Sequence, residues 1–163
     1  METIVTHGNV KILRYFNIRE KQFFHRNVLS YHTGVDIQCK EVYSGFPGTV
    51  VYIGKPDLKT SSVIVQYNNS NAFAYCNLKG VNVRKGDIVD TDDLIGTCFD
   101  FVHIEYLTTS PENKFRVMLT KQMFYKQDPL DILLNGYESF IDYPVEVAVS
   151  QAFLRNLTIE SEE

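Results

Sequence analysis

The chain has 163 residues, which is enough for one domain with a substantial core. Hydrophobic residues make up 44% and charged residues 22%, as in ordinary globular domains, and a net charge of −4 excludes a global basic field for nucleic acid. No apolar run reaches the ~20 residues that a transmembrane helix needs. Residues 1–15 lack the charged start and apolar block of a secretory signal peptide.

Signals for β-strands dominate the chain. Short runs rich in Val, Ile, Tyr and Phe alternate with clusters of Gly, Asn, Asp and Ser, a pattern typical of strands joined by tight turns. A first strand is predicted within residues 10–16, and residues 17–27 are interpreted as a loop or edge segment. Further strands are predicted at residues 49–54, 63–67, 72–78 and 99–107, with residues 115–125 as a strand or short helix.

The remaining elements are a hairpin and a helix. Residues 81–96 alternate short apolar pairs with glycine and acidic turns, which favours a short hairpin. A helix is predicted over residues 128–134, because Asp128 can cap its start and Pro129 suits the first helical position. Gly136 would end this helix.

Together these elements predict a mostly β fold, namely a twisted, folded sheet with short hairpins and few short helices. Residues 1–30 would form an N-terminal strand and approach loop, residues 31–136 the β domain, and residues 137–163 a C-terminal extension. The three cysteines are odd in number and lack C-x-x-C spacing, so neither a disulfide framework nor a cysteine zinc knuckle is expected.

One stretch carries candidate metal ligands. His32 and Asp36 are four residues apart, and in an extended segment even spacing places side chains on one face, with Gly34 leaving the space between them open. His103, which shares a predicted strand face with Glu105, would be a third ligand. Two imidazoles and one carboxylate suit zinc and leave a coordination position open. Without a metal, His32 and Asp36 would be a hydrogen-bonded surface pair.

Several ordered motifs resemble those of the lysostaphin-like (LytM-type) zinc metallopeptidases. The H-x-G-x-D motif of that family matches residues 32–36, and its H-x-H-x-E motif matches residues 101–105 in the second half only. Other matches are G-x-V-x-x-x-G at residues 48–54, V-x-x-G-D-x-V-x-x-x-D-x-I-G at residues 83–96 and D-P-L at residues 128–130. Several motifs in the family's order are more specific than any one alone.

The resemblance implies a lysostaphin-type fold, a duplicated hybrid motif, whose relatives cut the peptide bridges and stems of bacterial peptidoglycan. It implies that His32, Asp36 and His103 hold zinc. Two assisting histidines of the family are replaced here by Asn77 and Phe101. Asn77 can donate a hydrogen bond that orients substrate or an oxyanion, but neither residue carries a proton at pH 7. Hydrolysis is therefore expected to be weak or absent.

The neighbours of these residues have more than one interpretation. Glu105 either holds an imidazole or is a solvated strand residue. Tyr75 and Phe101 either belong to the core or line the substrate groove. Cys76 and Cys98 are expected to be small buried hydrophobes, with a thiolate near the metal as the less favoured alternative.

Two functions follow from the sequence. The first is a zinc-binding domain of the peptidoglycan metalloendopeptidase type, with a peptidoglycan peptide as its partner. The second is a non-catalytic component, such as a structural part of a phage particle, that binds cell wall or a protein in the former substrate groove. In either case we expect synthesis in the cytoplasm, with release by lysis or within a virion.

Overall fold

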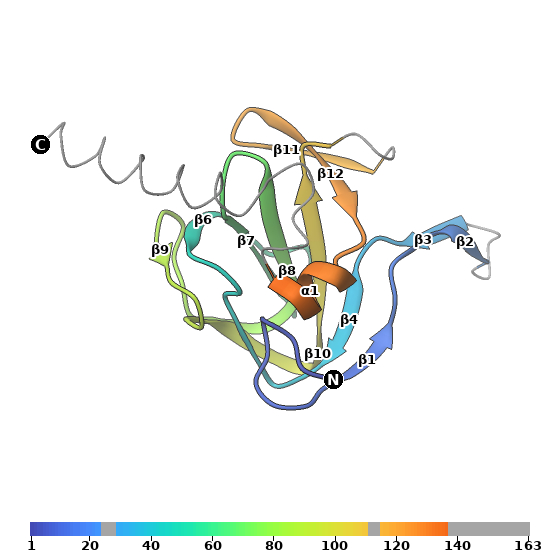
Figure 1. The fold of residues 1–163 in the computed structure, drawn as a ribbon, viewed down its shortest axis with the longest axis horizontal. Helices are drawn as coiled ribbons and strands as arrows, with labels where there is room; N and C mark the ends of the chain where they lie inside the picture. The colour runs from blue at the N-terminus through green and yellow to red at the C-terminus, as the bar shows by residue number, and fades with distance from the viewer. Residues whose placement is uncertain (24–28, 111–114, 137–163) are drawn as a thin grey trace, which may run out of the picture.

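The computed structural model describes residues 1–23, 29–110 and 115–136, and these residues are mostly β (Figure 1). The strands are β1 Lys11–Arg14, β2 Asn17–Phe23, β3 Leu29–His32, β4 Val35–Gln38, β5 Glu41–Tyr43, β6 Gly48–Gly54, β7 Ser61–Gln66, β8 Asn71–Val81, β9 Ile88–Val89, β10 Leu94–Thr108, β11 Arg116–Leu119 and β12 Gln122–Gln127. Within these ranges there is one short helix, α1, which covers Leu130–Asn135.

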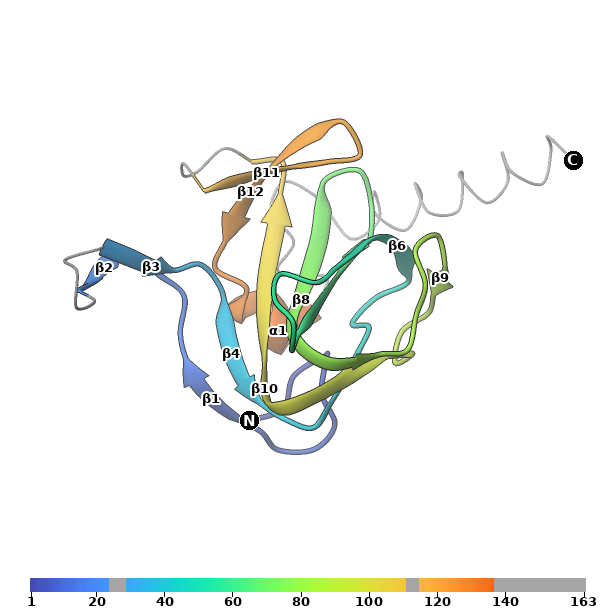
Figure 2. The same cartoon turned by 180° about the vertical axis from the view of Figure 1, so that it is seen from behind.

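Ten of these strands form one antiparallel sheet. Its main path runs β1-β4-β10-β8-β7-β6-β9, while β5 and β12 also pair with β10, and β11 pairs with β12. The 15-residue strand β10 is therefore the central strand of the domain, since it pairs with four other strands along its length (Figures 1 and 2). Strands β2 and β3 form a separate two-stranded sheet that leads into β4.

Alternation along β10 separates a core face from a second face, as the sequence predicts. Val102, Ile104 and Tyr106 are buried in the main core, whereas His103 and Glu105 between them are half-buried on the other face. The core face is strongly aromatic: the Phe73 ring makes edge contacts with its neighbours, among them Tyr106. Burial of these side chains supplies the hydrophobic free energy that holds the sheet in one register.

A smaller apolar cluster lies on the other face of the sheet. It joins the hairpin of β11 and β12 to β8 and β10 through Ala72, Ala74, Leu107, Leu119 and Phe124. The hairpin turns at Thr120 and Lys121, which both have positive φ angles. Residues 115–125, predicted to be a strand or short helix, are thus two strands that cap one end of the half-buried face.

The predicted strands and helix are present, with shifted bounds. Residues 17–23, interpreted as a loop or edge segment, form β2, and the hairpin expected at residues 81–96 contains only the short strand β9, which pairs with β6. Asp128 accepts a hydrogen bond from the Leu130 N–H at 3.0 Å at the start of α1, and Gly136 ends the helix with a φ of 74°. Residues 24–27, the turn at 111–113 and the extension at 137–163 lie outside the described residues.

Residues 3–6 pack into the domain. Val5 is fully buried, its carbonyl accepts a hydrogen bond from the Tyr43 N–H at 2.8 Å, and the Ile4 N–H donates to the Leu133 carbonyl at 2.9 Å. These contacts tie the N-terminal segment to β5 and α1. Within the described ranges, no helix has the length and apolar character required to cross a membrane.

Candidate metal centre

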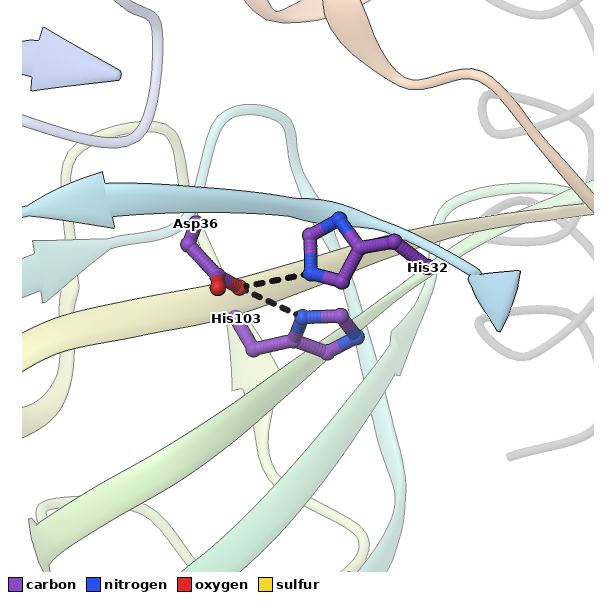
Figure 3. A group of neighbouring side chains, drawn as sticks. All are labelled: His32, Asp36 and His103. Carbon is purple, nitrogen blue, oxygen red and sulfur yellow. Dashed lines mark hydrogen bonds and ion pairs between the residues drawn. The ribbon is translucent and has the colours of Figure 1, made fainter. Parts of the chain in front are cut away.

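Three side chains, two of them four residues apart and the third distant in the sequence, converge above β4 and β10 (Figure 3). His32 ends β3, while Asp36 on β4 lies directly opposite His103 on β10 in the antiparallel register. The Asp36 Oδ1 atom lies 3.2 Å from His32 Nε2 and 2.7 Å from His103 Nδ1. One potential ligand atom from each residue lies within 4.8 Å of the other two, which is close enough for a shared metal ion.

Gly34 permits this convergence. A Cβ atom at this position would lie 2.3 Å from the Ile104 carbonyl oxygen and 2.8 Å from Cε1 of the His103 ring. Both distances are far shorter than van der Waals contact. Only glycine therefore allows the turn between β3 and β4 to approach the backbone of β10 and the imidazole of His103 so closely.

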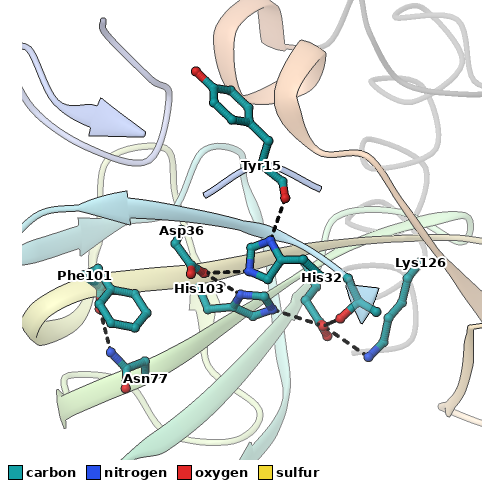
Figure 4. A network of polar contacts seen from close by, with 9 residues as sticks. Tyr15, His32, Asp36, Asn77, Phe101, His103 and Lys126 are labelled. Atoms are coloured by element: carbon teal, nitrogen blue, oxygen red, sulfur yellow. Dashed lines mark hydrogen bonds and ion pairs between the residues drawn. The ribbon is translucent and has the colours of Figure 1, made fainter. Parts of the chain in front are cut away.

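His32 is oriented by the backbone of the segment that follows β1. Its Nδ1 lies 2.7 Å from the Tyr15 carbonyl oxygen, and because a carbonyl can only accept, Nδ1 carries the proton (Figure 4). In a neutral ring Nε2 then has a lone pair, which points towards Asp36. This is the tautomer that binds a metal ion through Nε2, with the other ring nitrogen held by a hydrogen bond.

His103 is oriented by Glu105, two residues further along the same face of β10. Glu105 Oε2 lies 3.2 Å from His103 Nε2, and it accepts hydrogen bonds from Thr33 Oγ1 at 2.6 Å and from Lys126 Nζ at 3.1 Å. Figure 4 shows Lys126 on the far side of the imidazole from Asp36. With Nε2–H donating to Glu105, Nδ1 is the nitrogen left to face Asp36 and a metal ion.

The charges of this network are strongly coupled. Burial works against ionisation of His103, but hydrogen bonds to Asp36 and Glu105 outweigh it and raise the pKa of His103 to about 9. Burial likewise opposes the charge on Glu105, yet His103 and Lys126 lower the pKa of Glu105 to about 2. Burial opposes the charge on Asp36 too, but the hydrogen bonds and charges of His103 and His32 together outweigh it and lower the pKa of Asp36. The two carboxylates thus favour positive charge between them, either a proton or a metal cation.

Asn77 and Phe101 lie beside the three converging side chains, where β8 and β10 pair irregularly. Cys98 pairs with Leu78 but His103 pairs with Cys76, so β10 bulges around Phe101. Asn77 adopts a φ of 68°, which asparagine tolerates, and its Nδ2 donates to the Phe101 carbonyl at 2.9 Å. Asn77 therefore braces the bulge that precedes His103.

The other predicted neighbours fall on different faces. Tyr75 is fully buried in the main core, so of its two predicted positions the structure shows the core. Cys76, opposite His103 in register, is on the half-buried face, and burial together with the nearby Glu105 raises the pKa of its thiol to about 11. Cys76 is therefore a protonated thiol at neutral pH.

Sequence reasoning missed three partners of the network, namely Thr33, Lys126 and the Tyr15 carbonyl. Lys126 belongs to β12, which reaches Glu105 only through pairing between β12 and β10. No motif marks that pairing in the sequence. The Tyr15 carbonyl is a backbone group, and its identity as the acceptor for His32 depends on the path of the chain alone.

A comparison with models of protein families matched residues 30–122 to peptidase family M23. This match covers more than half of the chain and includes all three converging residues. The chain belongs to peptidase family M23. A search of curated protein sequences found no match.

Solved structures share the fold of this M23 domain. A chain in the structure of the SpoIIQ–SpoIIIAH pore-forming complex superimposes with a TM-score of 0.62 at 19% identity, covering 85% of this chain and 96% of that one. A zinc-containing peptidase from Vibrio cholerae gives 0.57 at 19% identity and covers 76% of this chain. Lysostaphin gives 0.56 at 18% identity, covering 85% of this chain and 55% of lysostaphin.

These identities are low, so the structural likeness establishes a common fold. The chain spans 37% of the Vibrio cholerae peptidase, which therefore contains much that has no counterpart here. The mostly β sheet predicted from the sequence, and its resemblance to lysostaphin-like domains, are confirmed by the family match and the shared fold.

The charge network predicts how the stability of the metal-free protein depends on pH. Because the pKa of His103 is raised from 6.5 to about 9, the folded protein holds this proton more tightly than the unfolded chain does. The stabilisation is complete below about pH 6.5 and is lost as the pH rises through about 9. We expect the free energy of unfolding to fall by on the order of 2 kcal/mol across this window, measured by urea denaturation at constant salt.

The control is His103→Gln, which keeps a polar side chain but cannot titrate. Its unfolding free energy should change less between pH 6.5 and 9 than that of the parent. An equal slope in both proteins would assign the pH dependence to other groups and contradict the prediction.

Proposed function

We propose that this M23 domain binds one zinc ion through His32, Asp36 and His103, contacts a peptidoglycan peptide, and hydrolyses it weakly or not at all. The observation that carries the proposal is the convergence of three ligand atoms of the kind that zinc prefers. The His32 tautomer supports it, because a carboxylate oxygen and a nitrogen lone pair face each other across 3.2 Å. Two acceptors at this distance favour a shared cation.

Bound zinc would supply Lewis acidity, which polarises a peptide carbonyl and acidifies water. The protein's own part is to hold the three ligands rigidly. Glu105 Oε2 accepts hydrogen bonds from His103, Thr33 and Lys126, so this oxygen is engaged in positioning. Its lowered pKa keeps it ionised at neutral pH, and an ionised carboxylate cannot donate a proton to a leaving amine.

The residues beside the proposed ligands lack groups that could transfer a proton, so we expect weak hydrolysis. Positioned groups that transfer protons or stabilise an oxyanion each contribute about 10²–10⁴-fold to a rate. Asn77 already donates one N–H to the Phe101 carbonyl, and its second N–H is left to orient a substrate or an oxyanion. The ring of Phe101 provides neither function. The site is thus better suited to binding a peptide than to cleaving it.

The surface near the site supports a peptide ligand. Ile64 pairs with Ala74, and Ala74 with Glu105, so the half-buried face of the sheet extends from the site towards β7. There a hollow of about 370 Å³ opens between the β6–β7 strands and the β11–β12 hairpin, lined by Val51, Tyr52, Ile64, Val117, Met118, Leu119 and Thr120. An apolar hollow beside a polar centre suits the aliphatic side chains of a stem peptide.

Zinc binding is tested by metal analysis of protein purified without chelator. We expect about one zinc ion per chain, and a loss of affinity of at least about 100-fold in His103→Ala, because a ligand is removed. The matched control is His7→Ala, since His7 is an exposed histidine paired with Asp92. If the His103→Ala protein is folded by circular dichroism and keeps parental zinc affinity, the proposed ligand set is wrong.

Hydrolysis is tested by the release of new amino groups from purified peptidoglycan. The parent should be weakly active or inactive, and the double variant Asn77→His with Phe101→His should gain activity by at least about 10²-fold, because two proton-carrying groups are added. The matched control is Asn77→Gln with Phe101→Leu, which carries no such groups. Strong activity in the parent that disappears on chelation would overturn the view that this site is degenerate.

A second candidate function is a non-catalytic structural role in binding a protein, for example in a phage particle. It is favoured by the likeness to a chain of the SpoIIQ–SpoIIIAH complex, 96% of which is covered at a TM-score of 0.62. Synthesis in the cytoplasm with delivery by lysis or in a particle belongs to this proposal.

Sedimentation with purified sacculi separates the two candidates. A peptidoglycan-binding domain should co-sediment with sacculi, and the complex should be weakened at least about 10-fold in the His103→Ala variant if the metal centre contacts the peptide. A protein that stays in the supernatant at all concentrations would favour the protein-binding role.

A further inference from the structure

A pair of cysteines lies close to the candidate metal centre without taking part in it. Cys39 follows β4, and Cys98 lies in the first third of β10; their Sγ atoms are 3.9 Å apart, and both are free thiols. Cys98 is only 4% exposed and belongs to the main core, and Cys39 packs against the same core. His103 and Asp36 are on the opposite face of the sheet, so the sheet separates the two thiols from the candidate metal centre.

The backbone holds both cysteines in place. The Cys98 N–H donates to the Lys40 carbonyl at 2.8 Å, and the Cys39 N–H donates to the Asp100 carbonyl at 3.3 Å. These bonds bridge the point at which β10 changes partner from β4 to β5. The third cysteine cannot compete for either thiol, because Cys76 packs in the small cluster on the other face of the sheet.

We propose that Cys39 and Cys98 form a reversible dithiol–disulfide pair that is oxidised by low-molecular-weight disulfides of the glutathione type. The sulfur atoms of a disulfide are bonded at ~2.05 Å, so the two thiols must approach by roughly 2 Å. Rotation of two cysteine side chains can supply this distance while the flanking backbone hydrogen bonds remain. The proposal is independent of whether the nearby site binds zinc.

The reaction begins at Cys39, the more exposed of the two thiols. The contact with the Cys98 thiol lowers the pKa of Cys39 and outweighs burial, which favours the Cys39 thiolate. That thiolate attacks one sulfur of the small disulfide, whose S–S bond breaks and releases one small-molecule thiolate. Cys39 is then joined to the other half of the reagent in a mixed disulfide.

In the second step Cys98 gives its proton to solvent and attacks the Sγ atom of Cys39. The mixed disulfide breaks and the second small-molecule thiol leaves. The protein has lost two protons and two electrons, equivalent to two hydrogen atoms, and the reagent has been reduced to two thiols. The hydrogen bond to Cys39, together with burial, raises the pKa of Cys98, so this step is the slower one.

The bond would cross-link the strands that carry two of the converging residues. Cys39 lies three residues after Asp36, and Cys98 precedes the bulge that ends at His103. Closing the long loop between residues 39 and 98 restricts the unfolded chain more than the folded one. Oxidation should therefore stabilise the whole domain.

The test is incubation of the full chain with oxidised glutathione, followed by intact mass measurement and peptide mapping without reduction. We expect the loss of two hydrogen atoms and a peptide linking Cys39 to Cys98, both reversed by dithiothreitol. Cys76→Ser should behave as the parent does, and Cys39→Ser should form no internal disulfide. The Tm of the oxidised parent should rise by about 5 °C or more, with no rise in Cys39→Ser.

Three results would overturn the proposal. The first is a stable adduct of one glutathione on Cys39 while Cys98 stays open to alkylation after unfolding. The second is an unchanged mass after oxidation under conditions that oxidise a reference dithiol. The third is an internal disulfide in Cys39→Ser, which would join Cys98 to Cys76.

Discussion

The register between β4 and β10 is the constraint on which the rest of the structure depends. It places Asp36 opposite His103 on one face while Val35, Ile37, Val102 and Ile104 are fully buried on the other. A slip by one residue would exchange the two faces and expose these four side chains, at roughly 1.5–3 kcal/mol each. That cost exceeds what the charged groups could gain by rearranging. The hydrophobic core therefore fixes the charged centre, and the centre has little influence on the fold.

This rigidity has an electrostatic consequence. Two carboxylates and two imidazoles are held together whether or not a cation is present, and without a metal the charge balance depends on the proton of His103 and on Lys126. Replacement of such a buried network by apolar residues is often neutral or stabilising in proteins, so its presence is not explained by stability. The close approach at Gly34 also argues against a purely stabilising role. If His32 and Asp36 were only a hydrogen-bonded surface pair, the ring of His103 would not need to lie against the turn that contains Gly34. The three side chains are thus arranged so that they could hold a cation.

The sequence predicts those parts of the structure that depend on local patterns of apolar, polar and turn residues. Alternation fixed which residues of β10 face the core, and turn chemistry located both ends of α1. Spacing alone, however, left His32 and Asp36 open to two interpretations. His103 was named as a third ligand from its place on a predicted strand beside Glu105, and the resemblance to a family then implied the same three residues. What escaped prediction depends on pairing between distant strands. The Lys126 contact requires β12 to pair with β10, and the proximity of Cys39 and Cys98 requires β10 to change partner between β4 and β5.

Strand β10 carries two different sets of reactive side chains on its two faces. Its half-buried face presents His103 and Glu105, while Cys98 faces the core behind them. Because side chains on opposite faces of a sheet do not touch, a change on one face reaches the other only through the backbone. The bulge between Cys98 and His103, braced by Asn77, is the segment through which such an effect must pass. A histidine in place of Asn77 would give the site a proton carrier but would remove the amide that holds this bulge. Asn77 thus stabilises the backbone that precedes His103, and under the proposed function it does so in the place of a residue that could transfer a proton.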